Sequence, residues 1–112
     1  MQKDDRLYVG HMLDLARKAG QRVRGKSRDD FDQDENLRIV LTHLIQTIGE
    51  AARRVSGEFQ REHPEVPWPA IIGMRHKIVH DYLSIDEDRV WRTVTEELGE
   101  LIDQLRALMP ER

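Results

Sequence analysis

A dense group of basic, imidazole and phenol side chains lies between residues 73 and 82, where the chain reads GMRHKIVHDY. Arg75 offers a planar guanidinium that grips a phosphate with two hydrogen bonds, and the His80 imidazole gives and takes protons near neutral pH. Metal-free cleavage of a phosphodiester needs a base, an acid and a cation that stabilises charge on phosphorus. Arg75 and His80 suit the central roles, and Tyr82 adds a phenol beside them. The segment therefore suits phosphodiester chemistry.

Four further residues are candidate supporting groups. His76 is a second imidazole, Asp81 can orient an imidazole, and Lys77 or Arg53 can hold flanking phosphates. Arg53 also has an ordinary structural explanation, because it follows Glu50 by three residues and such a pair stabilises a helix. We favour the structural explanation for Arg53.

A metal site is the main chemical alternative for the histidines. His76 and His80 are four residues apart, a spacing that can place two imidazoles on one metal ion. No helical glutamate accompanies them in the HExxH arrangement, and the chain has no cysteine. We therefore expect no metal ion and no cofactor.

The spacing of the site residues limits how they can meet. At about 100° per residue, Arg75 and Tyr82 share one face of a continuous helix, whereas His80 points roughly 140° away from Arg75. Two arrangements would bring His80 to Arg75. Either the helix terminates near Val79 and the backbone turns back, or the site combines residues from two protomers.

Periodic apolar residues predict the elements that must position this site. Apolar side chains recur at three- and four-residue steps in four segments, and no segment shows convincing strand alternation. Four amphipathic helices with short connections predict an all-α fold, an antiparallel four-helix bundle with room for a short extra helix. At 112 residues the chain is one domain, residues 1–112. The predicted helices cover residues 1–20, about 32–57, a short helix around 69–79 with Pro69 in its first turn, and about 84–108 capped by Ser84 or Asp86.

Gly49 lies inside the long predicted helix, where glycine costs about 1 kcal/mol relative to alanine. We infer that it permits the close approach of another helix, and a dimer contact is one candidate for that neighbour. Trp68 and Trp91 are interpreted as core or interface aromatics rather than as groups that stack on bases.

The charges are unevenly distributed along the chain. The net charge of −3 argues against a general nucleic-acid coat protein, because such proteins neutralise many phosphates. Yet six basic residues and no acidic one lie between Leu15 and Arg28, and five acidic residues follow by Glu35. We interpret these runs as charges that complement helix dipoles, and an RNA-steering basic patch is the alternative.

The composition also bears on the compartment. The absence of cysteine excludes disulfides and cysteine nucleophiles and fits a reducing environment. The N-terminal residues lack the apolar core of a signal peptide, and no apolar run approaches the length of a membrane span. We therefore expect a cytoplasmic protein with no membrane partner.

Three segments together resemble a known family. They are IGEAARRVS at 48–56, PEVPWPAIIGMRHKIVHDY at 64–82 and DEDRVW at 86–91. In the second segment, four residues separate Arg75 from His80, and one residue separates His80 from Tyr82. This spacing resembles the signature of the HepT-like toxins of the HEPN superfamily. In many relatives asparagine stands where this chain has His76, which leaves His76 open between a second catalytic imidazole and a bystander.

The resemblance implies a helical bundle that dimerises with its active site near the subunit interface. It implies RNase activity with Arg75 and His80 as the catalytic pair, and a nucleotidyltransferase antitoxin of the MNT type as a partner. In characterised members that antitoxin transfers AMP to the tyrosine that matches Tyr82. The alternatives are a non-catalytic module that binds a nucleotide or a nucleotidyltransferase, and a purely structural helical dimer.

Overall fold

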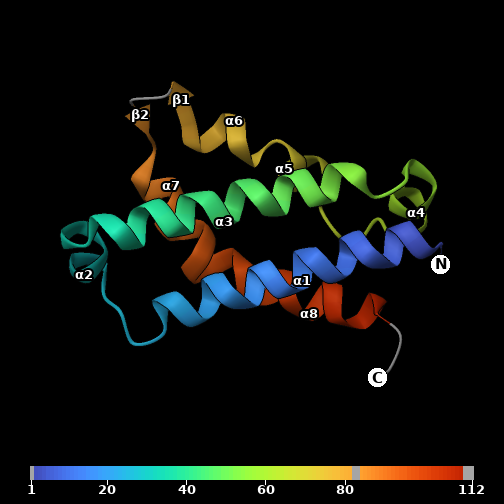
Figure 1. Cartoon of the computed structure of the whole chain (residues 1–112), viewed down its shortest axis with the longest axis horizontal. Helices are drawn as coiled ribbons and strands as arrows, with labels where there is room; N and C mark the ends of the chain where they lie inside the picture. The colour runs from blue at the N-terminus through green and yellow to red at the C-terminus, as the bar shows by residue number, and fades with distance from the viewer. Residues whose placement is uncertain (1, 82–83, 110–112) are drawn as a thin grey trace.

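The structure is a computed structural model that describes residues 2–81 and 84–109, and at 80 and 81 it describes the backbone alone. Helices dominate, and one pair of short strands projects from them (Figure 1). The elements in chain order are α1 (Lys3–Val23), α2 (Arg28–Gln33), α3 (Glu35–Arg54), α4 (Gly57–Glu62), α5 (Trp68–Ile72), α6 (Met74–Ile78), β1 (Val79–Asp81), β2 (Ser84–Ile85), α7 (Glu87–Arg92), the π-helical turn η1 (Thr93–Glu97) and α8 (Leu98–Leu108).

The two long helices α1 and α3 form an antiparallel pair along the longest axis of the molecule (Figure 1). α8 packs against α1, while α5 and α6 pack against α3 and run back along it. The expected helical fold is thus confirmed. The third predicted helix is two helices, α5 and α6, and the fourth is divided by η1, so the four continuous helices of the predicted bundle are not observed.

The core is made of the apolar stripes that the sequence predicts. Trp68 is almost fully buried, and its indole N–H donates to the carbonyl of His63 at 2.9 Å. Trp91 packs against the buried ring of Phe31, with ring centroids 5.1 Å apart. Both tryptophans are therefore packing residues, as predicted. The largest fully buried side chains are Phe31, Met12, Leu41, Ile78, Leu105, Val9, Val66 and Val90.

One buried carboxylate joins the beginning of α1 to the turn between α3 and α4. Asp5 is only 3% exposed, and it accepts hydrogen bonds from the Ser56 backbone N–H at 2.7 Å and from the Ser56 hydroxyl at 2.8 Å. The same hydroxyl accepts from the Phe59 N–H and begins α4. A buried charge needs such partners, so this contact fixes how the two segments meet.

The acidic run begins two helices rather than one. The predicted long helix starts near residue 32, whereas the structure has the short helix α2 first, because Ser27 and Asp30 form a capping box. Hydrogen bonds from the backbone N–H and hydroxyl of Ser27 hold the pKa of Asp30 below its ordinary value. Asp34 then accepts from the Leu37 N–H and begins α3. The predicted dipole role is confirmed for these two aspartates.

The short third helix breaks at Gly73. Pro69 lies in the first turn of α5, as expected, and its carbonyl accepts the Gly73 N–H at 2.9 Å. Gly49 faces this region, because a Cβ there would lie 3.0 Å from the carbonyl oxygen of Ile71. The close neighbour of Gly49 is therefore α5 of the same chain, and the dimer contact suggested for it is not needed.

The fourth helix is interrupted where the sequence predicts continuity. Asp86, and not Ser84, caps α7 by accepting the Arg89 N–H at 3.0 Å. Ser84 lies in β2 instead. The Thr95 hydroxyl donates to the Trp91 carbonyl at 2.7 Å, which competes with the main-chain hydrogen bonding of the helix at the π-helical turn.

Among the described residues, no helix is both long enough and apolar enough to cross a bilayer.

Candidate active site

The cationic residues of the site share the exposed side of α6. Arg75, His76 and Lys77 are exposed, whereas Met74 and Ile78 are buried. The two buried residues are four apart and lie on one helix face, which packs toward α3 and α7. Burial of this face fixes α6 and presents the three basic side chains to solvent.

The helix ends two residues before His80. The Val79 N–H donates to the carbonyl of Arg75, and Val79 itself is extended, with φ −112° and ψ 104°. The helix therefore terminates near Val79, as the first of the two arrangements requires, and the meeting of His80 with Arg75 stays a prediction in either arrangement. Because His80 lies outside the helix, the angle of about 140° expected for a continuous helix does not apply to it.

His80 lies at a register shift in the β1–β2 ladder. Val79 pairs with Ile85, and Asp81 pairs with Ser84, so β1 has one more residue than β2 between the two pairs. An extra residue of this kind forms a β-bulge, which bends the strand and changes the direction of its side chains. Bulges are frequent beside active sites for that reason, and here the extra residue is the predicted proton carrier.

Both ends of the segment that carries His80 are tied together by Asp86. Its backbone N–H donates to the Ile78 carbonyl at 2.7 Å, where α6 ends. Its side chain accepts from the first turn of α7. The hairpin is therefore closed at its base, and the ends of α6 and α7 hold it in place.

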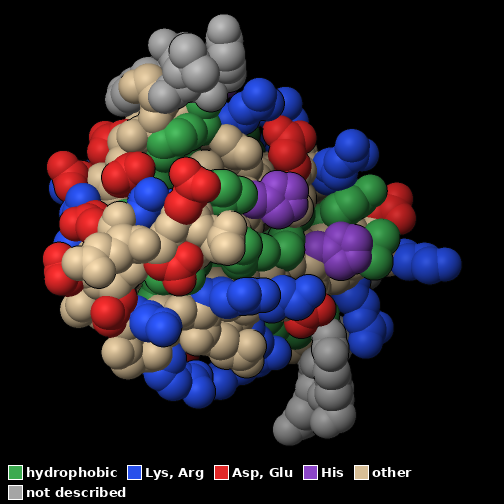
Figure 2. All heavy atoms as spheres, turned by 60° about the vertical axis from the view of Figure 1, so that its left-hand side comes forward, with side chains coloured by type: hydrophobic (Ala, Val, Ile, Leu, Met, Phe, Trp, Pro, Cys, Tyr) green, Lys and Arg blue, Asp and Glu red, His purple; other side chains and the backbone are tan. Residues whose placement is uncertain are grey.

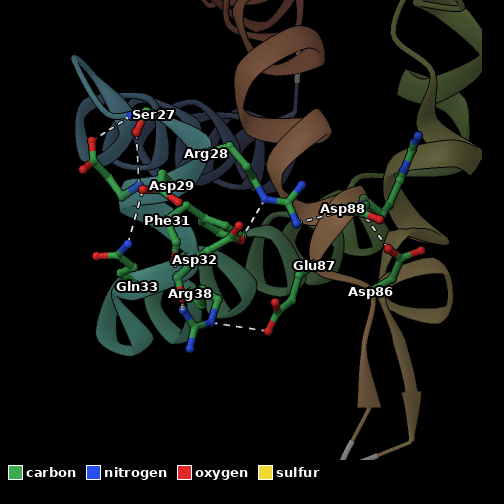
Figure 3. A network of polar contacts seen from close by, with 12 residues as sticks. Ser27, Arg28, Asp29, Phe31, Asp32, Gln33, Arg38, Asp86, Glu87 and Asp88 are labelled. Atoms are coloured by element: carbon green, nitrogen blue, oxygen red, sulfur yellow. Dashed lines mark hydrogen bonds and ion pairs between the residues drawn. The ribbon is translucent and has the colours of Figure 1, made fainter.

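A network of ion pairs braces the same region from the side (Figure 3). The Arg28 guanidinium contacts Asp32 at 2.8 Å and Asp88 at 2.7 Å, and hydrogen bonds to these two carboxylates raise the pKa of Arg28. Arg38 contacts Glu87 at 3.3 Å. Such partly exposed pairs contribute little stability, so their main effect is to orient α2 and α3 against the start of α7. The sequence did not predict the two contacts with α7, Arg28–Asp88 and Arg38–Glu87, because their partners lie far apart in the chain.

The structure describes the side chains of four predicted site residues, Arg75, His76 and Lys77 on α6 and Arg53 on α3. Arg53 lies on α3 and contacts Glu50 at 3.8 Å, in agreement with its structural interpretation. The side chains of His80 and Asp81 lie outside the described residues, as does the whole of Tyr82. Their contact with Arg75 stays a prediction. Within the described part of the chain, no three histidine, aspartate or glutamate side chains gather as metal ligands do.

Comparison with known proteins gives one family. Its model, described as Ribonuclease HepT-like, matches residues 12–108. A protein of Caldanaerobacter subterraneus subsp. tengcongensis that is named as a candidate RNase is 34% identical over 107 residues, which are 96% of either chain. A probable ribonuclease HepT of Thermococcus cleftensis is 34% identical over 73 residues, 65% of this chain and 66% of the relative.

A protein of Methanocaldococcus jannaschii, named as a gamma-glutamylcyclotransferase and candidate RNase, is 26% identical over 111 residues. The match covers 99% of this chain and 50% of that longer protein. No solved structure matches the chain significantly.

Proposed function

We propose that this chain, which belongs to the ribonuclease HepT-like family, cleaves RNA without a metal ion at the site formed by α6 and β1. One observation carries the assignment to these residues. α6 exposes Arg75 and ends at Ile78, so that His80 occupies the bulge of the strand that follows directly. A phosphate-binding cation and a proton carrier are thereby held on adjoining, anchored elements.

The reaction that these residues suit is internal transesterification of RNA. His80 removes the proton of a ribose 2′-OH, the 2′ oxygen bonds to the adjacent phosphorus, and the bond from phosphorus to the 5′ oxygen breaks. Arg75 binds the non-bridging oxygens and stabilises their developing charge. The leaving 5′ oxygen takes a proton, and the products are a 2′,3′-cyclic phosphate and a 5′-hydroxyl.

Three neighbours have supporting roles in this proposal. His76 adjoins Arg75 on the exposed side of α6 and is the candidate for the proton delivered to the leaving oxygen. Lys77 binds a flanking phosphate, and Asp81 orients the His80 imidazole.

The chemistry of the products tests the proposal directly. Purified protein is incubated with tRNA and with total RNA, with and without EDTA, and the ends of the fragments are identified by mass spectrometry. We expect cyclic phosphate and 5′-hydroxyl ends in equal yield with and without EDTA. Loss of cleavage in EDTA, or 5′-phosphate ends, would contradict the mechanism, and RNA that is bound but stays intact would favour a non-catalytic binding module.

We further propose that the protein is the toxin of a toxin–antitoxin pair and acts as a homodimer. A nucleotidyltransferase antitoxin silences it by transferring AMP to Tyr82. An adenylyl group two residues beyond His80 would place a phosphate where the substrate phosphate must bind, and its negative charge would repel RNA. The support for this regulation is membership in the family and the Arg75–His80–Tyr82 spacing.

Modification of Tyr82 is testable on the intact protein. Co-expression with a nucleotidyltransferase antitoxin of the MNT type is expected to increase its mass by one AMP group, together with loss of RNA cleavage. Tyr82→Phe, which keeps the ring and removes only the oxygen that would be modified, serves as the matched control and is expected to stay at its unmodified mass. An adduct that persists in Tyr82→Phe would place the modification elsewhere.

A further inference from the structure

The basic run between residues 17 and 28 divides into engaged and unengaged side chains. Arg28 is held by two carboxylates, and Lys26 lies beyond the end of α1, near Asp30, whose pKa is lowered mainly by the Ser27 hydrogen bonds and less by the Lys26 charge. The remaining four cations are exposed, and none of them forms an ion pair with any described residue. We call these four the α1 basic surface: Arg17, Lys18, Arg22 and Arg24.

The acidic run that follows does not neutralise this surface. Asp30 and Asp34 accept backbone N–H groups at the beginnings of α2 and α3. Asp32 contacts Arg28, and Asp29 accepts a hydrogen bond from the Gln33 amide. Four of the five acidic residues are therefore engaged within α2 and at its ends, and no ion pair among the described residues joins the fifth, Glu35, to the cations of α1.

Helix geometry concentrates the four charges. Arg17, Lys18 and Arg22 fall within about 140° of the helix circumference, and Arg24 follows directly at the C-cap of α1. Lys18 and Arg22 are four residues apart, and like charges at that spacing destabilise a helix by a few tenths of a kcal/mol. Asp14 precedes Lys18 by one turn, yet no ion pair joins them. The helix dipole accounts for Arg22 in the last turn of α1 and for Arg24 at its C-cap, whereas Arg17 and Lys18 lie further inside the helix and form no ion pair with a described residue.

The surface lies at the end of the molecule that also carries the hairpin. In Figure 1 the C-terminal end of α1 and the strands β1 and β2 both lie toward the left, with the first half of α3 between them. Figure 2 brings this end forward and shows Lys and Arg side chains along the lower edge of that face, whereas acidic side chains gather mainly on its left.

We propose that the α1 basic surface binds phosphate groups of the RNA strand that is cut at the α6–β1 site. The identity of the partner as RNA rests on the proposed function. Among the apolar residues of this part of α1, Leu13, Ala16 and Ala19 are buried in the core, and Leu15 and Val23 pack against it partly buried. The surface therefore offers charge without an apolar anchor, which suits a phosphate chain rather than a lipid bilayer.

Salt dependence of RNA binding tests this surface. The probe is a short fluorescent single-stranded RNA with 2′-O-methyl groups, which lacks the nucleophile for cleavage, and binding is followed by anisotropy from about 50 to 300 mM salt. The test variant carries R17Q, K18Q, R22Q and R24Q. The control variant carries K3Q, R6Q, R61Q and R106Q, four exposed cations at the opposite end of the long axis, so both variants change the net charge equally.

The test variant is expected to bind about tenfold or more weakly at low salt. The slope of its plot of log affinity against log salt should become less steep by about 3, since each phosphate contact on a single strand contributes about 0.7 to that slope. The control variant should change affinity less than about twofold, with its slope unchanged. Equal losses in both variants would mean a net-charge effect, and no loss in the test variant would remove this surface from RNA binding.

The experiment separates this inference from the proposed function. Binding is measured without any cleavage, so intact binding through the α1 basic surface in a protein that cuts no RNA would overturn the function alone. Circular dichroism of the test variant should show an unchanged helix content, because removal of the Lys18–Arg22 repulsion costs the helix nothing. A cleaving protein whose test variant binds normally would overturn the inference alone.

Discussion

Alanine at His80 is expected to lower kcat for RNA cleavage by about 10²–10⁴-fold, because a positioned general acid or base contributes that much to a proton transfer. Alanine at Arg75 is expected to lower kcat by about 10²–10³-fold through loss of the cation at the developing charge. Arg75 is exposed, so its replacement should leave the unfolding temperature nearly unchanged. Steady-state kinetics with a defined RNA, beside thermal unfolding of each variant, measures both effects.

Conservative variants separate chemistry from structure at this site. Arg75→Lys keeps the charge but loses the planar fork, so it should recover only part of the lost kcat. Arg53→Gln is the matched control, because Arg53 is an exposed arginine already paired with Glu50, and we expect kcat to change less than about twofold. Equal cleavage by the native protein and the His80 and Arg75 variants would show that the nuclease activity has another source.

His76 can be assigned in the same series. If it delivers the proton to the leaving oxygen, alanine there lowers kcat by a factor comparable to that of the His80 variant. If it has no catalytic role, kcat changes little, since the side chain is exposed and no described polar group would lose a hydrogen-bond partner with it.

Phe31→Ala is expected to lower the free energy of unfolding by about 3–5 kcal/mol, the usual cost of removing a buried phenylalanine. The Phe31 ring is fully buried and lies against Trp91, so it joins α2 to α7. Urea denaturation followed by circular dichroism measures the change. Alanine at this position should also loosen the attachment of the helix that carries Arg28.

Two substitutions in the same short helix control for this prediction. Phe31→Leu keeps most of the apolar volume and should cost distinctly less than alanine. Gln33→Ala removes an exposed side chain of α2 and should stay within about 0.5 kcal/mol of the native protein. A loss below about 1 kcal/mol for Phe31→Ala would mean that α2 does not pack on α7 in solution.

The long helices were predictable because their causes are local. Apolar stripes at three- and four-residue steps identify α1 and α3, and Asp86 was among the two caps expected for the last helix. The types and spacing of Arg75, His80 and Tyr82 also indicated the chemistry from the sequence, because a guanidinium carries a planar set of donors suited to phosphate and an imidazole has an ordinary pKa near neutral pH. The chemical role of His80 stays a prediction, because the structure describes only the backbone of this residue.

The tertiary structure decided how α6 ends and where His80 follows. The local sequence around Ile78 does not specify a bulged strand. The Ile78 carbonyl accepts a hydrogen bond from the N–H of Asp86, which follows the hairpin in the chain. The short helix α2 likewise depends on burial of Phe31 against Trp91 as well as on its capping box. These contacts join residues distant in the chain, and periodicity cannot report them.

The sequence and the tertiary structure also determined different properties of the residues at 73–82 and of the basic run at 17–28. The sequence by itself determined which side chains can bind phosphate and move protons, since that follows from residue type. Only the tertiary structure separated Arg28, which braces the site through Asp88, from the four cations of α1 that remain exposed. A charge is neutralised by the carboxylates that folding brings within a few ångströms, and sequence distance does not determine which those are.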